Sequence, residues 1–104
     1  MKKVAIVCCS APGSKRRLAE EALRLAAGLA ATGRLQVDLI LKDGGLLLLD
    51  PEFSGPTQTW DSLVSPTSRV VVSSDSPLPS NAPRTEKAED LQKLAQSADF
   101  VLRF

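Results

Sequence analysis

Three apolar runs along the chain have the length of β-strands. The first, from Lys3 to Cys9, is apolar at consecutive positions, which is typical of a central parallel strand covered on both faces. The second, from Leu35 to Leu41, alternates before it becomes continuously apolar, and a third run extends from Ala98 to Phe104. We therefore expect a parallel sheet with the first strand in the middle and the other two on either side.

Two stretches between these runs repeat apolar side chains at the helical period. In the first, from Lys15 to about Ala31, the stripe expected to face the sheet is Leu18, Ala22, Leu25 and Leu29. Ser14 is the expected N-cap of this helix, and Gly33 supplies its left-handed stop. A second helix is expected from Thr85 to Ser97, with Thr85 as its N-cap.

Strands that alternate with helices predict a doubly wound α/β fold, with helices on both faces of a parallel sheet. The 104 residues suffice for a single domain, 1–104. Residues 54–84 hold eight serines and five prolines, a composition that disfavours regular structure, so we expect an irregular insertion there. Within it, Val70–Val72 has strand propensity and is expected at a sheet edge, and the leucines at 46–49 are expected to be extended.

Charge and cysteine usage narrow the class of partner and the compartment. With 13 basic and 12 acidic residues the formal net charge is +1, which gives no electrostatic case for nucleic acid or a membrane surface. The first apolar run is too short for a signal peptide or a membrane span, so we expect a cytoplasmic protein. Cys8 and Cys9 are neighbours on opposite faces of a strand, so they cannot pair with each other, and reduced thiols fit such a compartment.

The absence of histidine removes two common chemistries. The usual general base of a hydrolytic triad and the commonest transition-metal ligand are both missing. The two adjacent cysteines do not have the spacing of a zinc site. From the residues we therefore expect no metal and assign no catalytic residue.

The loop after the first strand is the best candidate for a binding site. In doubly wound folds ligands bind at the carboxyl ends of the strands, where a loop of small residues that enters a helix can offer backbone N–H groups to a phosphate. Ser10 and Ser14 can donate hydroxyl hydrogen bonds, Gly13 allows close backbone approach, and Lys15 adds positive charge. The alternative is a plain turn followed by a helix cap, which uses the same residue types.

A third interpretation makes Cys9 a nucleophile in a phosphate loop of the kind found in low-molecular-weight tyrosine phosphatases. That loop needs an arginine where this sequence has Lys15, and Arg16 stands one position too far along. The spacing therefore argues against it.

Five segments lie in the order and rough spacing of a known family. They are Val4-Ala5-Ile6-Val7-Cys8-Cys9-Ser10, Leu18-Ala19, Val37-Asp38-Leu39, Leu48-Leu49-Asp50-Pro51 and Ala98-Asp99-Phe100-Val101. Together they resemble the NADPH-dependent FMN reductase family of flavodoxin-like proteins. The resemblance does not extend over residues 54–84.

The resemblance implies a flavodoxin-like three-layer α/β/α fold, FMN as cofactor, NADPH as co-substrate and oxidoreductase activity. It implies that Ser10 and, with a shortened loop, Ser14 contact the flavin phosphate. In the family a loop that contacts the flavin ring follows the segment matched by Ala98–Val101, whereas this sequence stops at Phe104. We therefore expect a truncated flavoprotein domain that holds a phosphate-containing small molecule without a complete active site.

A non-enzymatic alternative is a small structural or interaction module. The last strand would lack the outer neighbour that a complete sheet provides, so its backbone groups and apolar side chains need a cover. A second copy of the chain, forming a homodimer, or the Val70–Val72 segment folded back would supply one.

Overall fold

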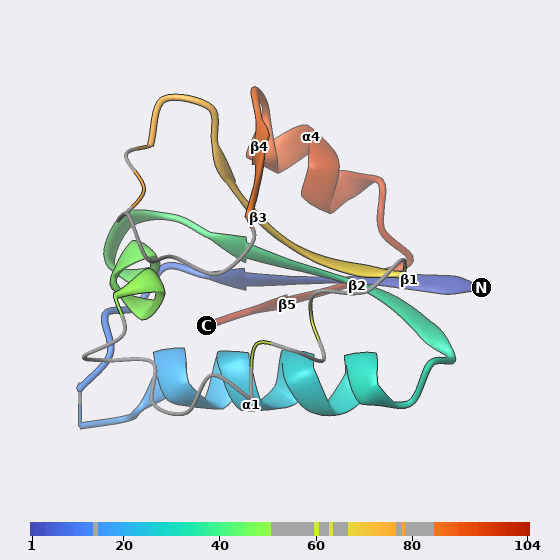
Figure 1. Cartoon of the computed structure of the whole chain (residues 1–104), viewed down its shortest axis with the longest axis horizontal. Coiled ribbons are helices and arrows are strands. Elements are labelled where there is room, and N and C mark those ends of the chain that lie inside the picture. The colour runs from blue at the N-terminus through green and yellow to red at the C-terminus, as the bar shows by residue number, and fades with distance from the viewer. Residues whose placement is uncertain (14, 51–59, 61–62, 64–66, 77, 79–84) are drawn as a thin grey trace.

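The described residues build one parallel sheet. The computed structural model describes residues 1–13, 15–50, 60, 63, 67–76, 78 and 85–104, which form five strands in the order β4-β3-β2-β1-β5 (Figure 1). The strands are β1 (Lys2–Cys8), β2 (Leu35–Leu41), β3 (Ser68–Ser73), β4 (Glu86–Ala88) and β5 (Phe100–Arg103). All neighbouring pairs are parallel, and β1 lies between β2 and β5. The prediction that the first strand lies between the other two is confirmed, and β3 and β4 extend the sheet beyond β2.

Helices cover the sheet on opposite faces. The long helix α1 (Leu18–Ala31) lies below the sheet in the view of Figure 1, and the short helix α4 (Leu91–Gln96) lies above it. The result is three layers, α/β/α, and the predicted fold class is confirmed. None of the helices in the described part of the chain has the length and apolar character needed to cross a membrane.

The helix α1 packs through alanines rather than through the predicted leucine stripe. Its buried residues are Ala19, Ala22, Leu23, Ala26 and Ala30, whereas Leu25 is 36% exposed. These side chains join a core with Val4, Ile6 and Cys8 of β1. Of the predicted stripe, Ala22 is buried and Leu29 packs against this core, whereas Leu25 is exposed. Small side chains let the helix lie close to the strands, so the buried face is shifted from the expected stripe and that prediction was right only in part.

The ends of α1 differ in how well they were predicted. The helix begins at Leu18, after Arg17 in a left-handed conformation with φ 53°, and no side chain caps its first turn. Lys15 therefore lies before the helix, and Ser14, the predicted cap, is outside the described residues. At the other end Gly33 has φ 69° and its N–H donates to the Ala30 carbonyl, so the predicted stop is confirmed.

The second half of the chain departs most from the predictions. Val70–Val72 lie in β3, which is buried between β2 and β4 and is not an edge. Glu86–Ala88 form strand β4 where a helix was expected. The helix α4 starts only at Leu91, and its cap is Asp90 instead of Thr85: Asp90 Oδ1 accepts a hydrogen bond from the Lys93 N–H at 3.0 Å.

The leucines at 46–49 are helical rather than extended. They belong to a 3₁₀ segment, η1 (Asp43–Leu49), in which Leu48 and Leu49 are buried. Both side chains join the core on the α1 face. A short 3₁₀ turn lets adjacent leucines reach the core together, which an alternating extended segment would not.

Candidate functional site

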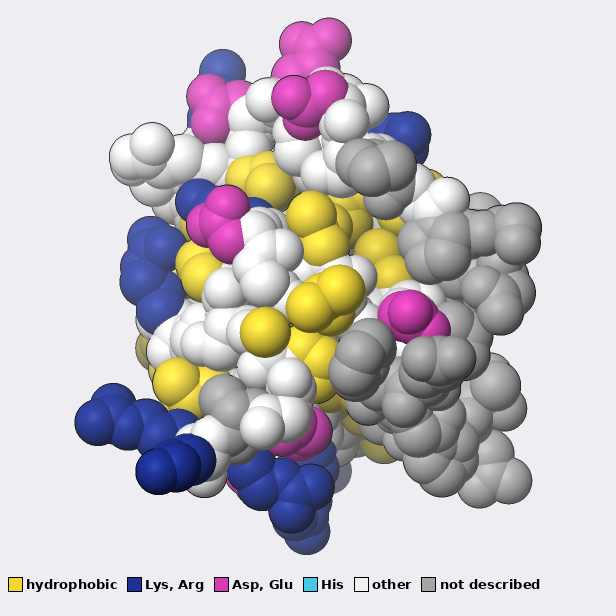
Figure 2. Space-filling view, turned by 90° about the vertical axis from the view of Figure 1, so that its left-hand side faces the viewer, with side chains coloured by type: hydrophobic (Ala, Val, Ile, Leu, Met, Phe, Trp, Pro, Cys, Tyr) yellow, Lys and Arg dark blue, Asp and Glu magenta, His cyan; other side chains and the backbone are white. Residues whose placement is uncertain are grey.

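The carboxyl ends of the strands meet at one edge, where the loops after β1 and β2 touch. A Cβ placed on Gly45 would lie 2.2 Å from the Cys8 carbonyl oxygen, and one on Gly44 would lie 2.8 Å from the Ala11 nitrogen. Only glycine permits these approaches, so η1 holds the start of the β1–α1 loop in place. Figure 2 looks onto this edge of the molecule, with Lys and Arg side chains gathered at its lower side, at the level of α1.

Three of the four predicted phosphate-binding residues can be placed. Ser10 is half-buried directly after β1, Gly13 has φ 84°, and Lys15 is exposed in the same loop; Ser14 lies outside the described residues. The Gly13 N–H donates to Glu20 Oε1 at 3.0 Å. Glu20 also pairs with Arg17, its Oε2 3.5 Å from Arg17 Nε. A carboxylate of the protein therefore already accepts the hydrogen bond that Gly13 would offer to a phosphate.

The two cysteines lie in different environments. Cys8 is buried, its thiol donates to the Ser10 carbonyl at 3.6 Å, and burial raises the pKa of this thiol. Cys9 is exposed, and both thiols are free, in agreement with the prediction that they do not pair.

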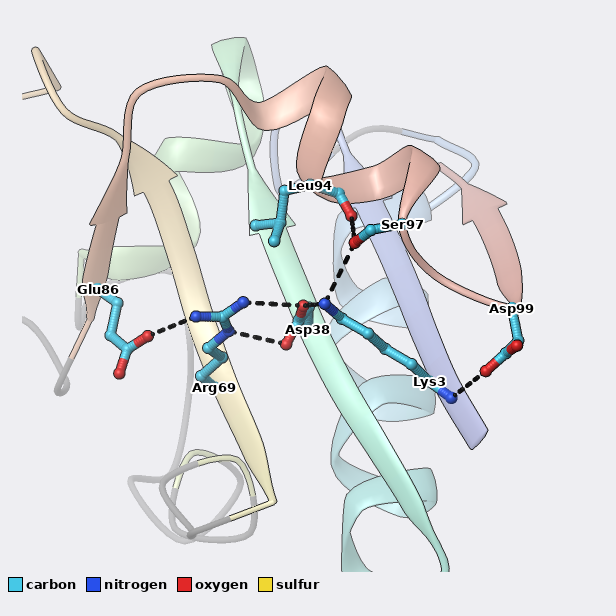
Figure 3. Close-up of polar contacts among 7 residues, drawn as sticks. All are labelled: Lys3, Asp38, Arg69, Glu86, Leu94, Ser97 and Asp99. Carbon is cyan, nitrogen blue, oxygen red and sulfur yellow. Dashed lines mark hydrogen bonds and ion pairs between the residues drawn. The ribbon is translucent and has the colours of Figure 1, made fainter. Parts of the chain in front are cut away.

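A buried carboxylate, Asp38, forms ion pairs with both neighbouring strands on the face of the sheet covered by α4. Asp38 of β2 is fully buried, and Arg69 of β3 reaches it with two nitrogens: Nε lies 2.9 Å from Oδ1 and Nη2 lies 3.3 Å from Oδ2. From the other side Lys3 Nζ lies 3.2 Å from Oδ2 (Figure 3). The hydrogen bond from Arg69 to Asp38 raises the pKa of Arg69 above its ordinary value.

The network continues outward on both sides of Asp38. Arg69 Nη1 lies 3.0 Å from Glu86 Oε2 on β4. Lys3 Nζ donates to Ser97 Oγ at 3.3 Å, and the Lys3 N–H donates to Asp99 Oδ2 at 2.8 Å. Alternating charges thus link β4, β3, β2 and β1 to the segment after α4, so the network has the structural role of holding these elements together.

Sequence reasoning missed this network. The signal was present in one residue, because Asp38 is a charged residue inside an otherwise apolar strand, and such a residue is buried only when paired. Its main partner, Arg69, follows 31 positions later. No local pattern joins the two positions.

The edge strand β5 exposes apolar side chains on both faces. Phe100 is 56% exposed, Val101 38% and Leu102 40%. One side of β5 pairs with β1, and no strand in the described part of the chain pairs with the other side. The Val70–Val72 segment does not cover this side of β5 as one of the predicted alternatives had it, because β3 lies beyond β2 on the opposite side of β1.

The described residues contain no group of three or more Cys, Asp or Glu side chains placed to hold a metal ion. The Asp38 network consists of paired charges.

Comparison with known proteins supports the fold. No family model matches the chain, and no curated protein matches it by sequence. Among solved structures, the crystal structure of the ychN protein from E. coli is similar over 100% of both chains, with a TM-score of 0.70 and 26% sequence identity. The likeness extends over the whole of the α/β architecture.

Proposed function

We propose that this chain is an interaction module that self-associates through the outer edge of β5. The observation that carries the proposal is the run of Phe100, Val101 and Leu102, all more than a third exposed on a strand whose outer side pairs with no other strand among the described residues. Exposed apolar side chains on an open strand edge are typical of a surface that pairs with another chain.

The geometry indicates how two copies would meet. Phe100 and Leu102 are in register with Val4 and Ile6 and share the α1 face, whereas Val101 shares the opposite face with Ala5. A twofold axis places the two β5 strands antiparallel, so that both sheets continue through the interface. Each half-exposed side chain that becomes buried contributes about 1 kcal/mol per copy.

The test is the mass of the protein in solution, measured by sedimentation or by light scattering. We expect a dimer for the wild type and a monomer for Leu102→Lys, because a charge on an edge strand opposes strand pairing. The matched control is Leu47→Lys in η1, which changes a side chain with 46% exposure that is not part of β5 and should leave the dimer intact. A monomeric wild type, or a Leu102→Lys variant with unchanged mass, would contradict the proposal.

A second candidate is an FMN reductase-like flavoprotein with NADPH as co-substrate. What favours it is the position of the Ser10–Lys15 loop, which follows the central parallel strand at its carboxyl end, where doubly wound folds bind ligands. A bound phosphate would have to compete with Glu20 for the Gly13 N–H. Removing that competition with Glu20→Ala should therefore strengthen FMN binding.

For this second candidate we expect purified protein to show a flavin absorption band. We also expect Ser10→Ala to weaken FMN binding. Colourless protein that takes up no FMN in titration, both as wild type and as Glu20→Ala, would eliminate it and would leave the self-association proposal unaffected.

A further inference from the structure

The connections of the sheet reverse direction beside β1. From β1 the chain passes through α1 on one face to β2 and on to β3 and β4 on the same side, whereas α4 crosses the opposite face to place β5 on the other side of β1 (Figure 1). In open α/β sheets, ligands bind outside the carboxyl ends of the strands at such a switch point. A pocket of about 160 Å³ lies there, between α4 and the ends of β1, β2 and β5.

The floor of the pocket is apolar and rigid. Val7 of β1 and Ile40 of β2 are neighbours in register, and Leu91 and Ala95 of α4 line the pocket from above. Backbone hydrogen bonds continue past the strand ends, from the Phe104 N–H to the Val7 carbonyl at 2.8 Å and from the Lys42 N–H to the Cys8 carbonyl at 3.1 Å. The floor is therefore formed before any ligand binds.

Two cations border this floor. Arg103 is in register with Val7 and so shares its face of the sheet. Lys42 continues β2 with extended backbone, φ −145° and ψ 158°, so it lies on the same face as Ile40 two residues earlier. Among the described residues neither cation forms an ion pair, and none of the residues lining the pocket is acidic.

The other end of the same sheet face gives the contrast. There Lys3 and Arg69 are each within 3.2 Å of Asp38 oxygens, so the charges of the protein neutralise one another. At the pocket the two positive charges remain uncompensated by the described residues. This difference distinguishes the structural network around Asp38 from a site that attracts an anion from solution.

We propose that this pocket binds a small organic carboxylate, with the carboxylate between Lys42 and Arg103 and a short apolar tail on Val7 and Ile40. The guanidinium of Arg103 suits a carboxylate because it can donate two parallel hydrogen bonds. The volume holds about five water-sized groups, which limits the buried part of the ligand to a carboxylate with a tail of about three carbons. The site is separate from the Ser10–Lys15 loop, and it shares only Arg103 with strand β5.

The experiment is an NMR titration of the full chain with butyrate, following backbone amide shifts. We expect saturable shifts at Val7, Ile40 and Lys42. Lys42→Gln and Arg103→Gln should each weaken binding about tenfold, the loss typical of one charge-assisted hydrogen bond. The charge-matched control is Lys15→Gln, which removes one positive charge from the exposed loop and should leave butyrate binding unchanged.

Changes in the ligand test the same geometry without altering the protein. Butyrate should bind more tightly than acetate, by about fourfold for each added methylene that becomes buried. Butylammonium, which has the same number of carbon atoms and the opposite charge, should produce no shift at the pocket.

Three outcomes would overturn the proposal: equal shifts with butylammonium, butyrate binding unaffected by Lys42→Gln and Arg103→Gln, or shifts confined to residues 10–17. Mass measurements on the same samples report on β5 separately, so failure of the pocket and failure of self-association are distinguishable.

Discussion

A carboxylate inside a sheet is stable only when the charges around it replace the water that it has lost. Asp38 is fully buried, and its two oxygens are reached by Arg69 and Lys3 from the neighbouring strands on both sides. The side chains of these partners are 35% and 20% exposed, so they can stay charged while their stems cover the carboxylate. Removing the carboxylate would leave Arg69 with the exposed Glu86 and Lys3 with the neutral Ser97 hydroxyl as their side-chain partners.

We expect Asp38→Asn to lower the free energy of unfolding by about 2 to 3 kcal/mol, less than for a fully buried ion pair because both partners partly reach water. Glu86→Gln is the matched control, because Glu86 binds the same arginine but its side chain is 50% exposed, and it should cost less than about 0.5 kcal/mol. Urea unfolding measures both values. Equal losses for the two variants would show that Asp38 does not anchor the network.

The buried thiol of Cys8 makes stability depend on pH. Burial raises its pKa above the ordinary value of 9.0, so the unfolded chain loses this proton at a lower pH than the folded chain. The contribution of Cys8 is therefore fully present below pH 9 and is lost as the pH rises through the folded-state pKa. Under reducing conditions, the free energy of unfolding should fall more steeply between pH 9 and the folded-state pKa in the wild type and in Cys9→Ala than in Cys8→Ala. A Cys8→Ala variant with the slope of the wild type would exclude this linkage.

At the scale of elements, the contact between η1 and β1 depends on glycine. A Cβ on Gly45 would overlap the backbone carbonyl of Cys8, and backbone atoms of a central strand cannot move aside. Gly28 on α1 differs, because a Cβ there would meet nothing within 4 Å and its backbone is helical. The same substitution should therefore have opposite effects at the two positions.

We expect Gly45→Ala to destabilise the protein by about 3 kcal/mol or more through overpacking. Gly28→Ala should stabilise it by about 0.5 to 1 kcal/mol, because alanine is the better helix former. Thermal unfolding followed by circular dichroism measures both. If Gly45→Ala melted at the wild-type temperature, η1 would not lie against β1 as described.

The elements that could be predicted are those whose signal is local. The strands β1, β2 and β5 lie in mainly apolar runs, and Gly33 ends α1 through its own conformation. The face of α1 was right only in part because a stripe of leucines is the stronger hydrophobic signal, whereas close packing on the strands selects alanines. The position of β3 was wrong because prolines around it suggested an edge, although pairing with β2 and β4 buries it.

The candidate sites could be predicted only in part for the same reason. The loop after β1 and the open edge of β5 follow from strand order, which the apolar runs indicate. The Asp38–Arg69 contact joins residues far apart in the chain, and so does the pocket that both Lys42 and Arg103 line. Their proximity depends on register and crossover, which no local pattern encodes.

At the scale of the whole molecule, the chain carries two outward features of different physical character. The edge of β5 is apolar, so association there is driven by removal of hydrocarbon surface from water. The pocket at the switch point presents exposed Lys42 and Arg103, so ligand binding there is driven partly by charge. Salt acts on these two driving forces in opposite directions, which allows them to be separated in one protein.

We expect sodium chloride to leave the dimer intact or to strengthen it, and to weaken butyrate binding at the pocket. Raising the ionic strength from about 0.01 M to 1 M shortens the Debye length from about 30 Å to about 3 Å, so the attraction of two exposed cations for a carboxylate is largely screened. Sedimentation and NMR titration on the same samples measure the two equilibria. Sodium sulfate at equal ionic strength is the control, because sulfate strengthens hydrophobic association while it screens charge as effectively. A dimer that dissociates as salt rises would mean that charge, and not the apolar run on β5, holds the two copies together.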